Sequence, residues 1–425
     1  MTDQLESKIL KGRGIFSSNN YRFESYFTVQ RQLAHTVILI QHFESTKHLS
    51  HLFFNSNLWS LSGQLEDGRP VAADQLMLSR IDSTDENVAE FSPLAGLSFG
   101  QSSLSPPVEA QYPLIGLFDG KFSIDEHGWT IEVHGDERVA LVAKRRSKAW
   151  GIPLEGLKLK LVNILKSSNE YHEKAQEIML LLSLATGSGV TSYRHIVNWD
   201  NQEEIEVWRK MTGDEIGPGP IIPAFKLGEF LKQALPIWRE WNSKKKSDAR
   251  LAIIYINLSA TGYLDTRLFQ ISQAWEFLAS SWMPGGVLTN LESDLQKKIK
   301  AGYREWKEDN PEADPEGYWG TRITFPFKWP KAKRQIESLI ESQRIDLSKI
   351  GLDFEALKEV RDSVAHTGKM RNQERPKKKD TYQLLLSAQF GLQLLLLTEL
   401  GYSGLVFTSN EDQRAEVPIE NYFKK

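Results

Sequence analysis

The chain has 425 residues, of which 40% are hydrophobic and 25% charged, as in ordinary globular proteins, and its length predicts two or three domains. A formal net charge of −3 argues against a globally basic nucleic-acid coat protein but leaves room for a local basic patch. The lack of cysteine excludes disulfides, thiolate metal sites and cysteine nucleophiles.

The first 150 residues predict an antiparallel β-rich domain, either a sandwich or a barrel. Short runs of alternating or β-branched residues read as strands, namely YFTVQ, TVILIQHF, LWSLSGQL, QLMLSRI, WTIEVHG and RVALVAKR. Segments such as DGRP, FDGK and EHG between them have the chemistry of turns. A helical period follows over 171–185, then a strand-like VTSYRHIVNW and a linker-like MTGDEIGPGPIIP with two Gly-Pro pairs. We therefore place an N-terminal domain at 1–220 and a second domain at 221–425.

The second domain is predicted to be an α-helical bundle with short loops, which makes the whole chain an α+β protein. Seven stretches have the period of a helix: 225–244, 249–261, 265–283, 288–306, 332–343, 354–368 and 380–401. The N-terminus lacks the apolar core of a signal peptide, and no apolar run approaches the roughly 18–20 residues that span a bilayer. We expect a cytoplasmic protein that does not contact a membrane.

The stretch RDSVAHTGK, residues 361–369, contains the most specific candidate for chemistry. On a helical wheel Leu357, Val360 and Val364 share one side, whereas Asp362 and His366 fall on the opposite side. The histidine is therefore expected to face away from the bundle core. Thr367 and the glycine after it are typical of a helix end, which would place His366 in the last turn.

This arrangement suits acid–base chemistry on a phosphodiester without a metal. Asp362 lies four residues before His366, where its carboxylate can orient the ring and favour imidazolium, as the helix C-terminus does. Arg361 has a long guanidinium that can reach a phosphate near the histidine. In RNA the nucleophile would be the substrate's own 2′-hydroxyl. An Arg-x4–6-His spacing occurs about once by chance in such a chain, so its setting on this helix matters more than the motif.

The motif also resembles a known family. RDSVAH on the penultimate long helix resembles the R-x4–6-H motif of HEPN ribonucleases, and QISQAWEFLASSW resembles their first core helix, which often carries a glutamate where Glu276 stands. Together with a β-rich N-terminal half, the chain resembles ApeA-like anti-phage defence proteins. The resemblance implies an abortive-infection endoribonuclease with Arg361 and His366 as catalytic residues and Asp362 as a helper. Many members carry a neutral polar residue where Asp362 stands, and the HEPN part would cover roughly 226–402.

The nuclease interpretation also predicts two binding partners, a second copy of the chain and RNA. One chain supplies one such histidine, whereas RNA transesterification benefits from both a base and an acid, so we expect a homodimer with two-fold symmetry through the helical domain. The run KMRNQERPKKK follows the motif and has a net charge of +5. It is either a solvated loop or a contact to the backbone of an RNA such as a tRNA. Its basic residues are Lys369, Arg371, Arg375, Lys377, Lys378 and Lys379.

Two other readings stay open at this point. In the first, the helical domain binds nucleic acid or a nucleotide without turnover. In the second, the β domain recognises a ligand and the helical bundle serves only for dimerisation. In the leading interpretation the N-terminal domain is a sensor, with a phage-derived trigger as its expected ligand. His42, His48 and His51 are close in sequence but lack standard zinc spacing, so we predict no metal site and no cofactor.

Overall fold

We describe the fold from a computed structural model of the chain, which divides into two compact units. The first comprises Met1–Glu215 with Ala224–Lys232, and the second comprises Ile216–Pro223 with Gln233–Lys425. The boundary expected near residue 220 thus falls in a short segment that groups with the second unit. The structure describes residues 9–18, 22–32, 35–40, 58–82, 88–94, 96–100, 106–114, 121–135, 157–163, 165–192, 194–199, 204–208, 218–283, 290–314, 332–367, 378–408 and 415–424.

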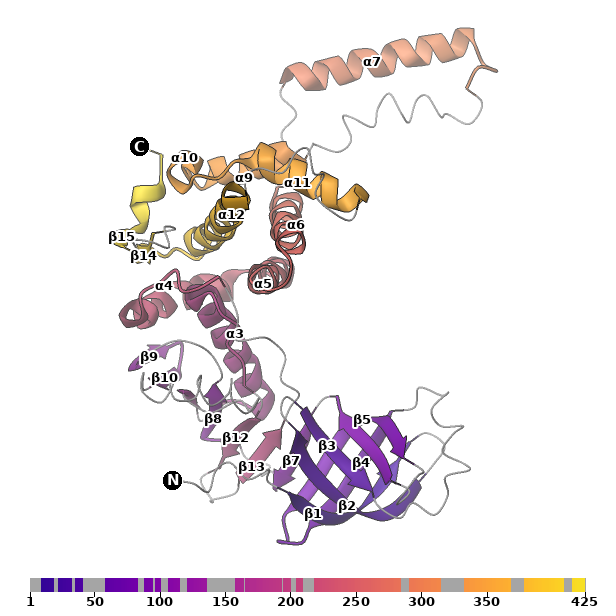
Figure 1. Cartoon of the computed structure of the whole chain (residues 1–425), viewed down its shortest axis with the longest axis vertical. Coiled ribbons are helices and arrows are strands. Elements are labelled where there is room, and N and C mark those ends of the chain that lie inside the picture. Colours follow the sequence, from indigo (N-terminus) through magenta and orange to yellow (C-terminus); the bar gives the residue numbers. More distant parts are fainter. Residues whose placement is uncertain are drawn as a thin grey trace. The chain divides into compact units, whose positions relative to one another are not determined.

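The first unit begins with six antiparallel strands that close into a barrel (Figure 1). Around the ring the order is β4-β1-β2-β3-β6-β5, and pairing of β5 with β4 closes it. The strands are β1 (Leu10–Ser17), β2 (Arg22–Gln32), β3 (His35–Ile40), β4 (Trp59–Leu65), β5 (Pro70–Asp82) and β6 (Val88–Pro93).

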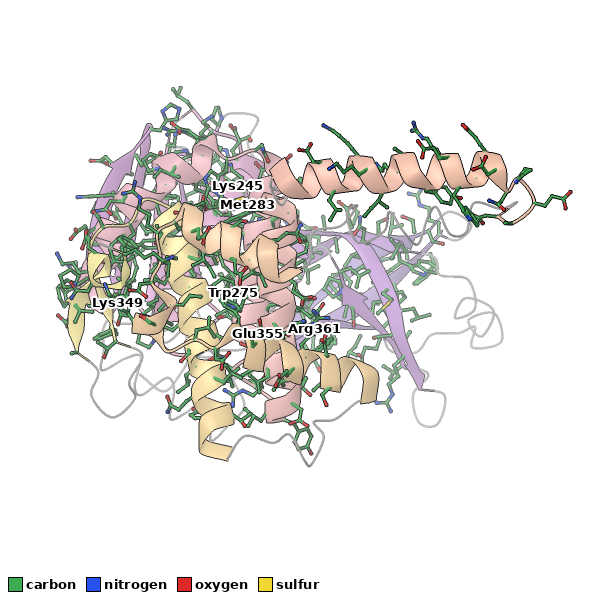
Figure 2. The ribbon with its side chains drawn as sticks, turned by 90° about the horizontal axis from the view of Figure 1, so that it is seen from above. Lys245, Trp275, Met283, Lys349, Glu355 and Arg361 are labelled. Atoms are coloured by element: carbon green, nitrogen blue, oxygen red, sulfur yellow. The ribbon has the colours of Figure 1, made fainter. Side chains whose placement is uncertain are left out.

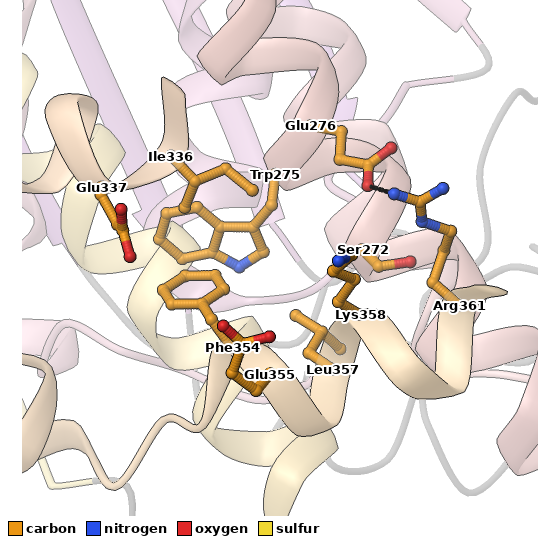
Figure 3. Close-up of a pocket in the computed structure, with 10 residues that line it drawn as sticks. All are labelled: Ser272, Trp275, Glu276, Ile336, Glu337, Phe354, Glu355, Leu357, Lys358 and Arg361. Atoms are coloured by element: carbon orange, nitrogen blue, oxygen red, sulfur yellow. Dashed lines mark hydrogen bonds and ion pairs between the residues drawn. The ribbon is translucent and has the colours of Figure 1, made fainter. Parts of the chain in front are cut away.

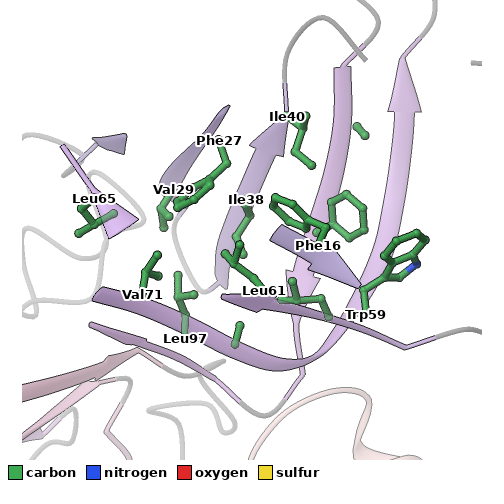
Figure 4. Close-up of a cluster of buried hydrophobic side chains, with 14 of the residues drawn as sticks. Phe16, Phe27, Val29, Ile38, Ile40, Trp59, Leu61, Leu65, Val71 and Leu97 are labelled. Carbon is green, nitrogen blue, oxygen red and sulfur yellow. The ribbon is translucent and has the colours of Figure 1, made fainter. Parts of the chain in front are cut away.

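Alternating apolar side chains fill the barrel interior, with Phe16, Ile38 and Leu61 among those drawn in Figure 4. Two glycines allow β1 and β4 to approach closely. Gly14 pairs with Gly63, and a Cβ atom on Gly63 would overlap the backbone of β1. The barrel therefore depends on small residues at this crossing as well as on its apolar core.

Seven further strands continue the sheet beyond the barrel through the pairing of β5 with β7. Their order is β7-β13-β12-β8-β11-β10-β9, and every pairing is antiparallel. They are β7 (Leu97–Gly100), β8 (Glu109–Leu114), β9 (Lys121–Glu126), β10 (Trp129–Gly135), β11 (Leu157–Val162), β12 (Arg194–Asn198) and β13 (Glu204–Trp208).

Helix α3 (Ser168–Thr186) packs on β8 and β11 of this extension. It begins with a capping box between Ser167 and Glu170 and ends at Gly187, whose φ of 54° is left-handed. The buried hydroxyl of Tyr171 joins the helix to the sheet, because it accepts from the Asn163 amide and donates to carbonyls that include that of Val108. The sequence predicted this helix over 171–185, one turn shorter at its start.

The second unit is helical, with α6 at its centre (Figure 1). Helices α5, α9, α11 and α12 all pack against α6. The helices are α4 (Leu227–Glu240), which begins in the first unit, α5 (Ser243–Leu258), α6 (Leu264–Trp282), α7 (Asn290–Asp309), α9 (Ala332–Ser342), α10 (Leu347–Ile350), α11 (Phe354–Thr367) and α12 (Lys378–Glu399). The short elements are η1 (Ala224–Lys226), β14 (Leu405–Phe407), β15 (Glu416–Pro418) and η2 (Ile419–Tyr422).

The predicted order, an antiparallel β-rich N-terminal part followed by a helical C-terminal part, is confirmed. The strand predicted at 138–145 lies outside the described residues, and several strands, including β1, β6 and β7, were not predicted. In the described part of the chain, no helix combines the length and the apolar character needed to cross a membrane.

Candidate functional site

Helix α11 carries the RDSVAH stretch, and local chemistry fixes where it starts. The Asp353 carboxylate accepts hydrogen bonds from the backbone amides of Glu355 and Ala356, which satisfies two free donors of the first turn. Leu357 and Val360 are buried, as the helical wheel predicted. The described part of the helix runs to Thr367, and the glycine predicted to end it lies outside the described residues. One side of α11 is therefore held in the core through Leu357 and Val360.

Arg361 of α11 forms an ion pair with Glu276 of α6, which brings together two residues 85 positions apart in sequence (Figure 3). Their side chains are only 23% and 25% exposed, so the pair is largely shielded from water. Arg361 also holds the Asp362 carboxylate through Nη1, at 2.9 Å. Its buried Nε has no hydrogen-bond partner among the described residues. The guanidinium is thus fixed by two carboxylates at the junction of α6 and α11.

The electrostatics of this junction follow from burial. Burial raises the pKa of Glu276 above its ordinary value, while the positive charge of Arg361 opposes the rise. The negative charge of Asp362 adds to it. The carboxyl of Glu276 is therefore a weaker acid than an exposed glutamic acid, and its ionised form depends on Arg361.

The structure describes only part of the predicted site. Arg361 and Asp362 are described, and Asp362 pairs with Arg361 with its side chain 42% exposed. His366 belongs to α11, but its side chain lies outside the described residues, so the expected contact between Asp362 and His366 stays a prediction. Two of the predicted RNA-binding residues, Lys378 and Lys379, begin α12, but their side chains are not described. The other four lie outside the described residues: Lys369, Arg371, Arg375 and Lys377.

A pocket opens beside the ion pair, between α6, α9 and α11 (Figure 3). Its volume is about 440 Å³, counted out to the open mouth. Trp275, Ile336, Phe354 and Leu357 supply apolar surface to its wall. Figure 2 shows Trp275 and Arg361 on neighbouring parts of the helical unit. The wall of the pocket is therefore apolar next to the fixed guanidinium, and Trp275 and Leu357 within it are almost fully buried.

Charged and polar side chains complete the lining of the pocket. Glu276 and Arg361 lie at one side as an ion pair, and Ser272 contributes a hydroxyl that donates to the Phe269 carbonyl. The further charged residues are Glu337, Glu355 and Lys358. An apolar wall with a few charged groups is typical of a small-molecule or nucleotide site.

Sequence reasoning on the residues alone did not find this pocket. Trp275, Ile336 and Phe354 come from three helices and each reads as an ordinary core position. Glu276 was singled out only through the resemblance to a family. The sequence feature that could have indicated this site is a glutamate within an otherwise apolar helix face, because a charge at such a position needs a partner.

Comparisons with known proteins give no further identification. The sequence matches no family model and no curated protein, and the structure matches no solved structure. The candidate function is therefore argued from the site.

Proposed function

We propose that the protein is a metal-independent endoribonuclease of the HEPN type, an ApeA-like anti-phage defence protein acting by abortive infection in the cytoplasm. The observation that carries the proposal is the placement of Arg361. Its guanidinium is oriented by Glu276 and Asp362 at the edge of a pocket, and His366 follows on the same helix. A fixed cation and a titratable imidazole within six residues of one helix are the groups that RNA transesterification needs.

The chemistry proceeds within the substrate. A general base takes the proton of the ribose 2′-hydroxyl, and the resulting oxygen attacks the adjacent phosphorus. The bond from phosphorus to the 5′-oxygen breaks, and a general acid protonates that leaving oxygen. The products are a 2′,3′-cyclic phosphate and a 5′-hydroxyl. His366 serves as base or acid, and Arg361 stabilises the negative charge that builds up on the phosphate oxygens.

A second histidine would come from a second copy of the chain. A two-fold axis beside α11 would give one site two imidazoles and two guanidiniums. The basic run that follows α11 would then bind the RNA backbone, and the N-terminal unit would sense a phage-derived trigger. Mixing unmodified protein with an excess of His366→Ala should lower cleavage below that of the diluted unmodified protein, because mixed dimers lack one of the two imidazoles.

Cleavage of RNA in EDTA tests the proposal. Purified protein should cut RNA to products with 2′,3′-cyclic phosphate ends, and His366→Ala and Arg361→Ala should each lose this activity. His134→Ala is a matched control, because it removes an exposed histidine from strand β10 of the first unit. Circular dichroism and hydrogen exchange of α11 verify that the variants are folded. Undiminished cutting by folded His366→Ala would refute the assignment.

In cells, the same variants test the defence role. Expression of the unmodified protein should slow growth during phage infection and reduce plaque formation, whereas His366→Ala should do neither. Protection that survives His366→Ala would separate defence from RNA cleavage.

A further inference from the structure

Helix α7, a continuous helix of 20 residues in Figure 1, carries an exposed apolar stripe along one side. Leu295, Ile299 and Trp306 follow one another at spacings of four and seven residues, which places them within about 40° around the helix axis. Leu295 is 49% exposed and Trp306 is 42% exposed. None of the main contacts between described elements involves α7. Because a helix gains most of its stability from packing of its apolar face, the stripe indicates an interaction surface.

A glycine interrupts the stripe near its centre. Gly302 follows Leu295 by seven residues and therefore lies on the same side of α7. Glycine inside a helix is destabilising relative to alanine. A Cβ atom at this position would meet nothing within 4 Å, so no described neighbour requires a glycine there. The missing side chain leaves a notch in the stripe, and a side chain of a facing helix can fill such a notch.

The charges of α7 indicate which partner fits the stripe. The helix has five basic and five acidic residues, so its net charge of zero favours neither nucleic acid nor an anionic membrane. Two opposite charges, Lys298 and Glu305, flank the stripe on the same side, seven residues apart. Neither forms an ion pair within the described part of the chain. A surface that presents one lysine and one glutamate at this spacing is complementary to an antiparallel copy of itself.

We propose that α7 binds α7 of a second copy of this chain in an antiparallel pair, related by a two-fold axis near the centre of the helix. In this alignment Ile299 faces the partner's Gly302, and Leu295 faces the partner's Trp306. Lys298 then lies opposite the partner's Glu305, and the symmetry of the pair repeats each contact. A parallel pair would place Gly302 opposite the partner's Gly302, which leaves the notch unfilled and both charges unmatched. The inference goes beyond the proposed function, because it involves neither RNA nor α11.

The length of the stripe sets the strength of this contact. It spans residues 295–306, about 17 Å of helix, and the charge of Asp309 ends it. A contact of this size is small for a specific interface, so we expect a dissociation constant on the order of 10 µM. Sedimentation equilibrium of the full-length protein measures it.

Disulfide cross-linking tests the alignment directly, because the chain has no cysteine of its own. Full-length Leu295→Cys/Trp306→Cys is treated with oxidised glutathione, above the measured dissociation constant, and analysed on a non-reducing gel. The two positions are about 17 Å apart along one helix, whereas a disulfide needs Cα atoms within about 7 Å, so the two cysteines of one chain cannot bond each other. The double variant should yield a covalent dimer, and each single variant should not. Equal cross-linking by the single variants, or none by the double variant, would refute the antiparallel pair.

Charge reversal supplies a test that leaves the apolar stripe intact. Lys298→Glu and Glu305→Lys each place like charges opposite each other twice, so each should weaken association about tenfold in sedimentation equilibrium. Combining the two reversals restores opposite charges across the pair and should return the dissociation constant to within about threefold of its original value. Lys297→Glu is the matched control, because it makes the same change at a side chain that is 77% exposed and lies on the side of the helix away from the stripe. Association that the double reversal does not restore would contradict the alignment.

Gly302→Leu separates association from helix stability. Leucine forms helices better than glycine, so α7 should gain protection from hydrogen exchange in the monomer. The new side chain fills the notch that the partner's Ile299 occupies, so association should weaken about tenfold or more. Tighter association would contradict the alignment.

The outcomes separate this inference from the proposed function. A dimer that neither charge reversal weakens, and that does not cross-link through positions 295 and 306, would refute the α7 pair and leave pairing through α11 standing. If no RNA cleavage is found but the double reversal restores association, the α7 pair is supported and the nuclease is refuted. A monomer whose α7 is protected from hydrogen exchange would show that another part of the same chain covers the stripe, and this would overturn the inference.

Discussion

The ion pair between Arg361 and Glu276 can be measured with a double-mutant cycle. The variants are Arg361→Met, Glu276→Gln and the double variant, all of which keep side chains of similar length. Both partners are about three-quarters buried, with 23% and 25% of their side chains exposed. Removing one partner of a fully buried pair costs about 3–5 kcal/mol, whereas exposed pairs contribute about 0–1 kcal/mol. At this intermediate burial we expect a coupling free energy of about 1–2 kcal/mol.

The two single variants should not be equal. Glu276→Gln leaves Arg361 its contact to Asp362, so it should cost about 1–2 kcal/mol. Arg361→Met leaves the Glu276 carboxylate without its cation in a buried place, so it should cost about 2–3 kcal/mol. Protonation of Glu276 limits this second cost, because burial raises its pKa already in the intact pair.

Hydrogen exchange of α6 and α11 in rising urea is the suitable assay, because the chain has two units and a global transition would mix them. Single and double variants are compared at the same peptides, with Glu359→Gln as a surface control on α11. Additivity of the two single variants within about 0.3 kcal/mol would show that the pair contributes no coupling and would refute the reasoning.

The pH dependence of the same cycle supplies an independent check. Because the pKa of Glu276 is raised in the folded state, protonation of this group favours folding. That contribution is fully present below the unfolded pKa and is lost as the pH rises through the folded pKa. Glu276→Gln should remove it, whereas Arg361→Met should enlarge it, because the cation that opposes the shift is gone.

Three further predictions concern the first unit. Tyr171→Phe should cost about 1–3 kcal/mol in urea unfolding, because it leaves the buried Asn163 amide without its acceptor. Burial raises the pKa of Tyr171 to about 12, so ionisation of its hydroxyl lowers the stability of the folded state above pH 10. Tyr171→Phe should also remove this loss of stability. The Lys166 ammonium lowers the pKa of Glu170 to about 2, so the stability that Glu170 contributes is present above pH 4.5 and is lost as the pH falls toward 2. Glu170→Gln should reduce this loss of stability at acid pH, measured as ellipticity against pH. Gly128→Ala should cost about 1–2 kcal/mol in calorimetry, because φ is +79° there although the added Cβ has room, and Gly128→Asn should recover part of it.

The helices could be predicted from the sequence because their signals are local. The predicted 265–283 corresponds to α6 at Leu264–Trp282, and the predicted 354–368 corresponds to α11 at Phe354–Thr367. Each has a continuous apolar side and a recognisable beginning or end within a few residues. Helix α10 was missed because four residues cannot display a helical period.

The barrel depends on contacts that no local pattern contains. Strand β1 was not predicted, since Gly12 and Gly14 lower strand propensity. Both glycines are needed there because a Cβ at either would overlap neighbouring strands, as it would at Gly63 of β4. The pairing of β5 with β4, β6 and β7, which closes the ring and begins its extension, was likewise not contained in any local sequence pattern.

At the candidate site, Arg361 and Asp362 were visible in the sequence, whereas the pairing of Arg361 with Glu276 was not. Position 361 could be placed on the flank of α11 from periodicity, but Glu276 lies on a helix 85 residues earlier. The pocket wall requires knowing that α6, α9 and α11 meet, which packing decides. Sequence reasoning therefore yields the candidate residues, whereas the structure yields the ion pairs that join them and the pocket beside Arg361.

The N–H donors of Arg361 that its carboxylate partners leave unused decide how an anion could be held there. A guanidinium has five N–H donors, of which one on Nη2 bonds Glu276, while Nη1 forms an ion pair with Asp362. Nε is buried and has no partner within the described residues. The Nη atoms carry more N–H groups than the contact to Glu276 uses, so the number of donors alone does not require a bound phosphate to displace either carboxylate. The carboxylates then act by orienting the guanidinium, and Glu276→Gln should lower kcat of the proposed reaction more than it changes KM, because misorientation affects the transition state most.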